Sequence, residues 1–446
     1  MKKIWKYVIL FVVFLFTMTV FYLPFRLDTY VNYGFSYGIV NGQIPYNDFN
    51  IIVPLFSPFL YSILLVFNKS ILVYYIEQAI LLVVFSIYLF KLLDNKAWFV
   101  IASLFCPFIF LFAYCMFPGY NFIILLELLL LIYYEEKQSD SIIGIIAGMA
   151  VITKHSVGIP IFIVAILYPL LKNKNWKSSL KRLLFGLIPI LIFLIYLLCS
   201  SSLTSFIDYC LLGMDDFTNS FQYSSYYLVL IIILLILISI KFFKTKNKNI
   251  SYFYLLAYLP IIYPTINSYH ASLFMFFLFI VFIYNTEIHI PKRIVLYSFI
   301  IIFLFISMYD FLSRNHFSQL NLYYYHNFPV EFISPSLKKD YDSIIKFNKK
   351  HKVILIDDAS KNIFITSTCN HKLNKYFILL KGNQGSGGTK KLISNLKNEH
   401  DVYYVVPKEV VCHNKFCQFD IDIPEMIKKE YTLYSELNNY YIYYSE

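Results

Sequence analysis

The sequence predicts an all-α polytopic membrane domain, residues 1–313, followed by a small α/β domain, residues 314–446. The membrane domain is predicted by composition, because 59% of the 446 residues are hydrophobic and only 15% are charged. It is also predicted by apolar runs of bilayer length, which recur up to about residue 313. After that point the charged fraction rises, and helical and strand-like patterns alternate, which is typical of an α/β fold.

The first apolar run, from Tyr7 to about Leu23, follows the basic start MKKIWK. No small-x-small cleavage site follows it, so we interpret it as a first membrane span entering from the cytoplasm and not as a signal peptide. Further candidate spans bring the total to about eleven, and lie at residues 71–90, 97–117, 121–134, 141–153, 156–171, 183–200, 226–243, 251–268, 271–285 and 294–312. Several are shorter than the ~20 residues of a perpendicular crossing, so their ends are approximate.

The basic residues predict the orientation of the chain. If residues 51–67 form a re-entrant or interfacial helix that does not cross the bilayer, nearly all Lys and Arg of the membrane domain lie in cytoplasmic loops. Pro54 and Pro58 are compatible with the start of such a helix. The N-terminus is then cytoplasmic and the C-terminal domain extracytoplasmic. Most Lys and Arg of the first 313 residues lie in short clusters between apolar runs, so the net charge of +11 does not indicate a nucleic-acid partner.

The C-terminal domain contains predicted helices and strands in alternation. The predicted helices are residues 336–350, 388–398 and 424–430, and the predicted strands are residues 352–357, 375–380, 402–406 and 439–445. A glycine-rich stretch that begins at Gly382 resembles a phosphate loop, but Thr389 precedes Lys390, which is the wrong order. We therefore expect a turn before a helix.

Two further patterns in this domain are short. Asp420 and Asp422 have the spacing of a metal-binding pair, but alternation along a strand produces the same spacing equally often. Cys412 and Cys417 could form a disulfide in an oxidising medium, and Cys369 then remains as a third thiol. The cysteines of the membrane domain are interpreted as small apolar packing residues.

The first outer loop, residues 25–70, carries Asp28 and Asp48 among aromatic residues and glycines. A carboxylate beside a bilayer is costly to desolvate, so Asp28, which lies four or five residues after the first span, is a functional candidate. The alternative is a solvated interfacial aspartate that pairs with Arg26.

A motif follows Asp28 by about fourteen residues, Gly-x-x-Pro-Tyr-x-Asp-Phe from Gly42 to Phe49, and precedes a Pro-containing apolar helix. Together with the stretch from Thr153 to Gly158 at an outer helix end, and Pro264 to His270 in another outer loop, it resembles the polytopic glycosyltransferases of the GT-C fold, among them mannosyl- and arabinosyltransferases. Many members carry Asp-Glu where this chain has Asp28 and then Thr. The departure leaves Asp48 as the candidate for a second acid.

The resemblance implies that a polyprenyl-phosphate-linked sugar is transferred, by a single inverting displacement, to a glycan, lipid or protein acceptor on the outer face of the membrane. Asp28 is then the expected base and Asp48 its partner or the ligand of a divalent metal, the one cofactor left open. Lys154, His155 and Arg26 are expected to hold the donor phosphate. The residues expected to bind the acceptor or the sugar are Tyr46, His270, Asp215 and Asp216.

Two other classes of protein fit the composition. A transporter, flippase or polymerase for lipid-linked glycans would have the same polytopic architecture, and a transporter would favour charges near the bilayer midplane. Glu77 and Glu127 are the clearest such charges. A non-catalytic scaffold whose outer domain binds a partner is the third class, but it gives no reason for Asp28 and Asp48 in one loop.

Overall fold

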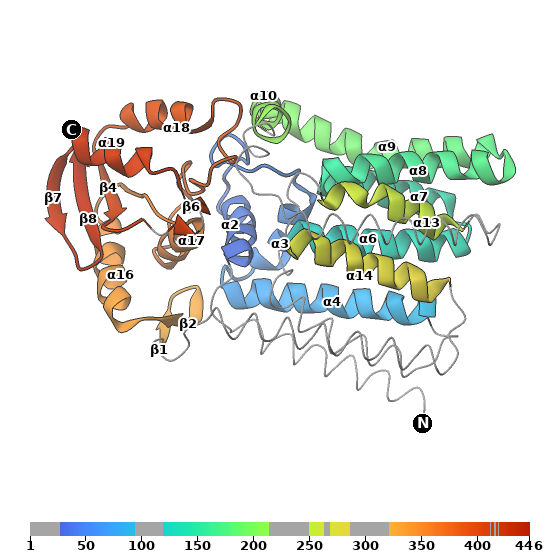
Figure 1. Ribbon diagram of the computed structural model, residues 1–446, viewed down its shortest axis with the longest axis horizontal. Helices are drawn as coiled ribbons and strands as arrows, with labels where there is room; N and C mark the ends of the chain where they lie inside the picture. Colours follow the sequence, from blue (N-terminus) through green and yellow to red (C-terminus); the bar gives the residue numbers. More distant parts are fainter. Residues whose placement is uncertain are drawn as a thin grey trace.

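The computed structural model describes residues 27–93, 119–213, 249–262, 268–285, 321–410, 412–413, 416–417 and 419–446. The described residues form a helix bundle with an α/β domain at one end (Figure 1). We call that end of the bundle, where α4, α6 and α8 begin, the near end, and the opposite end the far end. The backbone N–H of Ile71 at the start of α4 donates to the carbonyl oxygen of Asn327 in the α/β domain, 2.9 Å away.

The bundle contains the long apolar helices of the chain. Its described helices are α4 (Ile71–Leu93), α6 (Gly119–Glu136), α7 (Asp140–Thr153), α8 (His155–Asn173), α9 (Trp176–Cys199), α13 (Ile250–Ala257) and α14 (Ser268–Tyr284). In the described part of the chain, α4, α8 and α9 are long and apolar enough to cross a membrane. The prediction of about eleven spans is therefore not supported. The helices α7 and α13 are too short, and the first predicted span and those at 97–117, 226–243 and 294–312 lie outside the described residues.

Glycines bring α7 and α9 into close backbone contact. A Cβ atom on Gly148 of α7 would lie 2.1 Å from the carbonyl oxygen of Gly186 in α9. A Cβ atom on Gly144, one turn earlier, would lie 2.4 Å from the carbonyl oxygen of Arg182. Because no side chain separates the two helices here, their backbones approach as in the small-residue contacts of membrane helices.

A buried ion-pair network joins the far ends of the helices. Arg182 of α9, 4% exposed, donates from Nε to Asp140 of α7 at 2.7 Å and from both Nη atoms to Glu135 of α6 at 2.5 and 3.0 Å. Its Nη1 also donates to the carbonyl oxygen of Ala165 in α8, and the hydroxyl of Tyr254 in α13 donates to Glu135 at 3.3 Å. One guanidinium thus connects four helices directly, and Glu135 joins α13 to them as a fifth.

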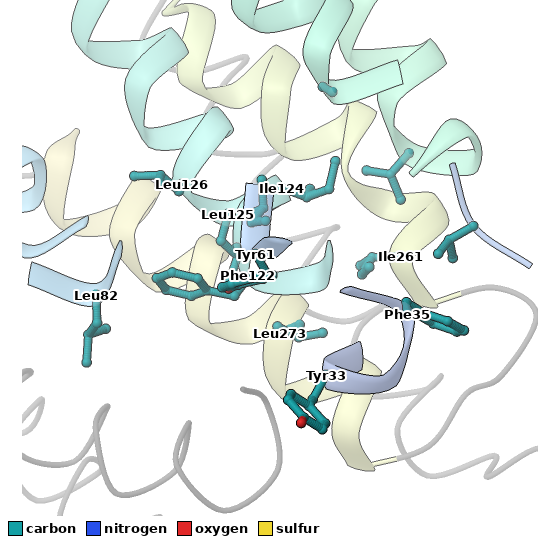
Figure 2. Packing of buried hydrophobic residues seen from close by; sticks show 14 of the residues in the cluster. Tyr33, Phe35, Tyr61, Leu82, Phe122, Ile124, Leu125, Leu126, Ile261 and Leu273 are labelled. Atoms are coloured by element: carbon teal, nitrogen blue, oxygen red, sulfur yellow. The ribbon is translucent and has the colours of Figure 1, made fainter. Parts of the chain in front are cut away.

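The predicted outer loop contains two helices, α2 (Leu27–Val40) and α3 (Phe56–Leu65). The predicted helix within 51–67 is confirmed, and its 10 residues are about half of what a crossing needs. Helix α2 was not predicted. Figure 2 shows members of one buried hydrophobic cluster that includes Tyr33 and Phe35 of α2, Tyr61 of α3, Phe122 of α6 and Leu273 of α14, so the loop is part of the core.

The α/β domain is built on a mixed sheet of strand order β3-β4-β8-β7. Its strands are β3 (Val353–Leu355), β4 (Val402–Pro407), β7 (Thr432–Glu436) and β8 (Tyr440–Ser445), with β3 and β4 parallel and the other pairs antiparallel. Its helices are α16 (Pro335–Asn348), α17 (Ala359–Thr368), α18 (Gly388–Lys397) and α19 (Asp422–Glu430). Two further sheets are separate from the mixed sheet and have two strands each. One pairs β1 (Asn321–Tyr325) with β2 (Phe328–Ile333), and the other pairs β5 (Cys412–His413) with β6 (Phe416–Cys417). Cys412 and Cys417 are register partners, and their disulfide stays a prediction.

The predicted α/β content of the C-terminal domain is confirmed, with one wrong element. Residues 375–380 do not form a strand, because side-chain amides bind their backbone. The Nδ2 atom of Asn50 donates to the carbonyl oxygen of Ile378 at 3.0 Å, and Nε2 of Gln384 donates to the same oxygen at 2.6 Å. The predictions also missed α17, which packs against α2.

Side-chain amides fix the α/β domain to the first loop. Gln43 pairs with the backbone of Leu373 through two hydrogen bonds, Nε2 to the carbonyl oxygen at 2.9 Å and the Leu373 N–H to Oε1 at 2.7 Å. Asn50 bonds to Ile378 as above and also to the carbonyl oxygen of Asn383 at 2.9 Å. One continuous hydrophobic cluster extends from the bundle through α2 into α17, so the two parts share a core.

The glycine-rich loop forms the turn before α18 that the sequence predicts. It receives the carboxylate of Asp208, which lies in a π-helix (Asp208–Leu212) after α10 (Leu203–Ile207). The N–H and hydroxyl of Ser386 donate to Asp208 at 3.0 and 2.5 Å, and Lys391 Nζ donates at 2.7 Å. Burial raises the pKa of Asp208, but these hydrogen bonds outweigh burial and lower the pKa overall. Gly385, at φ +75°, leaves room for the carboxylate.

Candidate functional site

Lys154 lies at the near end, between α7 and α8. Its extended backbone (φ −153°, ψ 98°) separates the two helices, and its carbonyl oxygen accepts the first hydrogen bonds of α8. The half-buried side chain donates from Nζ to Oδ1 of Asn121 in α6 at 3.0 Å. Its ammonium also lies 5.4 Å from the ring centroid of Tyr120. The cation is therefore held at the start of α6, beside the helix boundary.

Two histidines accompany this cation. His155 begins α8 and His270 lies in the first turn of α14. His155 directly follows Lys154 in the chain, and α8 and α14 both contact the short helix of residues Leu259–Ile262. The buried Nδ1 of His155 has no hydrogen-bond partner in the described part of the chain. The structure thus brings together Lys154, His155 and His270, which the sequence predicted as separate candidates for phosphate and sugar binding.

The first loop contributes polar side chains next to this group. A Cβ atom on Gly119, at the start of α6, would lie 2.5 Å from Oγ of Ser57 and 3.1 Å from Oδ1 of Asn32 in α2. It would also lie 2.9 Å from the ring of Tyr61 in α3. Since Gly119 precedes Asn121 by only two residues, α2 and α3 reach the helix that binds Lys154.

Several buried polar atoms towards the near end lack a hydrogen-bond partner among the described residues. They are Ser57 Oγ, Glu77 Oε2, Glu127 Oε2, His155 Nδ1 and Tyr258 OH. The other carboxylate oxygen of Glu127 accepts a hydrogen bond from the hydroxyl of Thr153, the residue before Lys154, at 2.8 Å. Buried polar atoms are nearly always paired in folded proteins, so a group of unpaired ones indicates a place for water or a ligand.

Asp48 and Tyr46 shape the loop that carries them. Asp48 is exposed, and its Oδ2 accepts a hydrogen bond from the N–H of Ile44 at 2.7 Å, which closes the turn. Tyr46 has a positive φ of 70° and is 1% exposed, and its hydroxyl donates to the carbonyl oxygen of Val53 at 2.9 Å. Its ring packs on Phe206 of α10 at a centroid distance of 5.4 Å. These two residues belong to the α9 and α10 side of the near end.

The remaining predicted site residues are less fully described. Asp28 lies in the first turn of α2, one turn before Asn32, so its backbone lies near the start of α6. Arg26, Asp215 and Asp216 lie outside the described residues.

Sequence reasoning missed Asn121 and Ser57 as members of this group. Each is a single polar residue within an apolar or aromatic stretch, and that position is the one signal that could have identified it. Glu77 and Glu127 did stand out in the sequence, as the expected mark of a transporter.

Within the described residues, no group of three His, Cys, Asp or Glu side chains could hold a metal ion. Asp420 is not part of a strand but precedes the start of α19. Its carboxylate accepts hydrogen bonds from Thr389 Oγ1 at 3.0 Å and from the N–H of Asp422 at 3.3 Å. Comparison of the chain with protein-family models, with curated proteins and with solved structures finds no match.

Proposed function

We propose that the protein is a membrane glycosyltransferase that transfers a sugar from a polyprenyl-phosphate-linked donor to a glycan, lipid or protein acceptor at the cell surface. The observation that carries this proposal is the position of Lys154 and His155, at the boundary of α7 and α8, and of His270, in the first turn of α14, at one end of a bundle of apolar helices. A lipid phosphate requires cationic or hydrogen-bonding groups at the membrane boundary. The unpaired Nδ1 of His155 is available for such a bond.

Helix α8 also offers a surface for the polyprenyl tail. Ile159, Ile163 and Leu167 follow His155 at intervals of four residues and therefore lie on one stripe of the helix. Each is more than two-fifths exposed. A phosphate held at Lys154 and His155 would thus have an apolar stripe beginning directly beside it, along which an isoprenoid chain can lie.

In this reaction the acceptor hydroxyl attacks the anomeric carbon and the lipid phosphate leaves with its negative charge. Asp28 is proposed to take the proton of that hydroxyl, and Lys154 to stabilise the departing phosphate. Asp48 is proposed as a second acid or as a ligand of a divalent metal. Ser57 Oγ and Glu77 Oε2, which are buried without a partner among the described residues, are proposed to form hydrogen bonds with the sugar.

The test follows sugar transfer from a radiolabelled polyprenyl-phosphate donor in membranes with matched expression. Lys154→Ala should raise the donor KM about 10- to 100-fold, because a hydrogen bond to a charged group contributes about 1.5–3 kcal/mol. Lys172→Ala is the matched control, since Lys172 lies at the other end of α8, 5.3 Å from the ring of Tyr168. An unchanged donor KM in Lys154→Ala would remove the phosphate-binding role.

Asp28→Asn tests the chemical step in the same assay. Loss of a general base typically lowers the rate ~10²- to 10⁴-fold. The substitution keeps the size of the side chain, so we expect the protein to fold and insert normally. Full activity in this variant would contradict the mechanism.

A proton- or cation-coupled transporter of lipid-linked glycans is the second candidate. It is favoured by Glu77 and Glu127, which are 6% and 3% exposed and each carry one unpaired oxygen. Buried carboxylates of this kind are common in coupled transport. Reconstitution distinguishes the two functions, because in a transporter Glu127→Gln should abolish movement of a labelled glycolipid between leaflets, whereas a transferase moves none.

A further inference from the structure

Five aromatic rings form a cluster on one face of the C-terminal sheet, which we call the aromatic platform: Phe347, His351, Tyr403, Tyr434 and Tyr444. Tyr403 of β4 occupies its centre. The centroid of the Tyr403 ring lies 4.9 Å from the rings of Phe347 and His351, 5.1 Å from Tyr434 and 4.8 Å from Tyr444. Phe347 and His351, from the end of α16 and the turn after it, also stack on each other at 4.4 Å.

The platform remains open to solvent. Tyr434 is 55% exposed, and His351, Tyr403 and Tyr444 are partly exposed. Strands β7 and β8, which carry Tyr434 and Tyr444, lie at the end of the C-terminal domain away from the helix bundle (Figure 1). Tyrosines that serve packing alone are buried, as Tyr440 of β8 is, whereas the rings of the platform are partly or largely exposed.

A backbone irregularity places Tyr434 in this cluster. Strand β7 is the edge of the sheet, and its register with β8 shifts between Leu433 and Ser435, so Tyr434 is the extra residue of a bulge. Bulges re-aim a side chain and interrupt the ladder of an edge strand. The interruption disfavours addition of a partner strand at this edge and leaves the ring of Tyr434 as the feature presented to a ligand.

Polar groups border the rings. The hydroxyl of Tyr444 donates to Asp401 at 3.0 Å, and Lys352, whose carbonyl oxygen accepts from the N–H of Tyr403, pairs with Glu399 at 2.7 Å. Aromatic faces pack on the C–H faces of pyranose rings, while charged and hydroxyl groups at the border bind the equatorial hydroxyls of such rings. This combination suits a carbohydrate better than a purely apolar partner.

We propose that the aromatic platform binds a glycan chain, with pyranose rings stacked on Tyr434 and Tyr403 and hydroxyls bonded to Asp401 and Lys352. The binding does not depend on the proposed transfer reaction, and its test measures binding alone.

The experiment uses the full-length protein in detergent, in native gels cast with either a soluble β-glucan or a soluble α-mannan. Retardation relative to a polymer-free gel gives the dissociation constant. We expect retardation of the wild type in at least one gel, about 10-fold weaker binding by Tyr434→Ala, and wild-type binding by Tyr434→Phe, which keeps the ring. Tyr324→Ala is the matched control, because Tyr324 of β1 is a 75% exposed tyrosine outside the platform.

The proposal is overturned by absence of retardation in both gels, or by equal retardation of the wild type and Tyr434→Ala. Tyr434 lies on an exposed edge strand, so Tyr434→Ala should unfold at the wild-type temperature, and that measurement separates lost binding from lost structure. A transferase that is active but not retarded would leave the proposed function in place and remove only the platform.

Discussion

The two ends of the helix bundle differ in whether their buried polar groups have hydrogen-bond partners. At the far end, the donors of Arg182 are directed to Glu135, Asp140 and a backbone carbonyl. Towards the near end, Glu127 and His155 each bury an atom without a hydrogen-bond partner among the described residues. The paired groups of the far end stabilise the folded protein. The unpaired buried atoms of the near end lower its stability, and a bound ligand that forms hydrogen bonds with them can offset this loss.

The difference predicts how substitutions at the two ends will act. Far-end substitutions should lower the stability of the folded protein, and through it the amount of active protein. Substitutions of near-end polar groups that lack a partner should change binding and transfer while stability stays nearly constant. The four predictions below test this contrast, from the largest expected loss of stability to the smallest.

The largest effect is expected for Arg182→Ala. Removing the guanidinium leaves the buried carboxylate of Glu135, together with Asp140, without its counter-charge, and breaking a buried pair in this way costs about 3–5 kcal/mol. Thermal unfolding of the purified protein in detergent should show a large decrease in Tm. Lys177→Ala, at an exposed position near the same end of α9, is the control and should leave Tm unchanged. A decrease no larger than that of the control would contradict the role assigned to the network.

The next effect is expected for Gly148→Ala. The new Cβ would lie 2.1 Å from a backbone oxygen of α9, which no rotamer change relieves, so the helices must separate at a cost of about 1–3 kcal/mol. Gly42→Ala is a useful comparison because its Cβ has no atom within 4 Å, but its φ of +74° is strained for alanine, at about 1 kcal/mol. Equal losses of stability in the two variants would show that close packing of α7 on α9 contributes little.

A smaller and local effect is expected for Gln43→Ala. The substitution removes both hydrogen bonds to Leu373 and leaves a buried N–H and carbonyl unpaired, at about 2 kcal/mol. Hydrogen exchange should accelerate in α2 and α17, which meet at this interface, and stay unchanged around Arg182. Asn41→Ala, which loses contacts within the loop only, is the control. Unchanged exchange in α17 would mean that the two hydrogen bonds of Gln43 are not needed to hold the domains together.

Local patterns in the sequence predicted much of this fold. The helix α16, the turn before α18 and the strand β4 follow from periodicity and turn residues near each position. Helix α2 could not be predicted, because its burial depends on distant partners such as Ile363 of α17, which contacts Gly34 from 329 residues later in the chain. Residues 375–380 read as a strand for the same reason, since the amide of Asn50 that binds their backbone lies far away in sequence.

The candidate site was predictable to a similar extent. The position of Lys154 and His155 at a helix boundary marked them, because a cation there is unusual in an apolar chain. The grouping of these residues with His270, and the unpaired atoms of Ser57 and Tyr258, depend on how helices pack in three dimensions. Ser57 and Tyr258 could therefore be recognised only in the structure, which shows that their buried polar atoms lack a partner among the described residues.

The smallest effect, and the most direct test of the contrast, comes from two tyrosines one turn apart. Tyr254 and Tyr258 are both fully buried, but the hydroxyl of Tyr254 donates to Glu135, whereas that of Tyr258 has no partner among the described residues. Tyr254→Phe should therefore cost about 1 kcal/mol of stability, and Tyr258→Phe should be neutral or slightly stabilising. Thermal unfolding of both variants, in the same detergent, measures the difference. If Tyr258→Phe loses as much stability as Tyr254→Phe, the hydroxyl of Tyr258 is paired in solution, and the contrast between the two ends fails at this position.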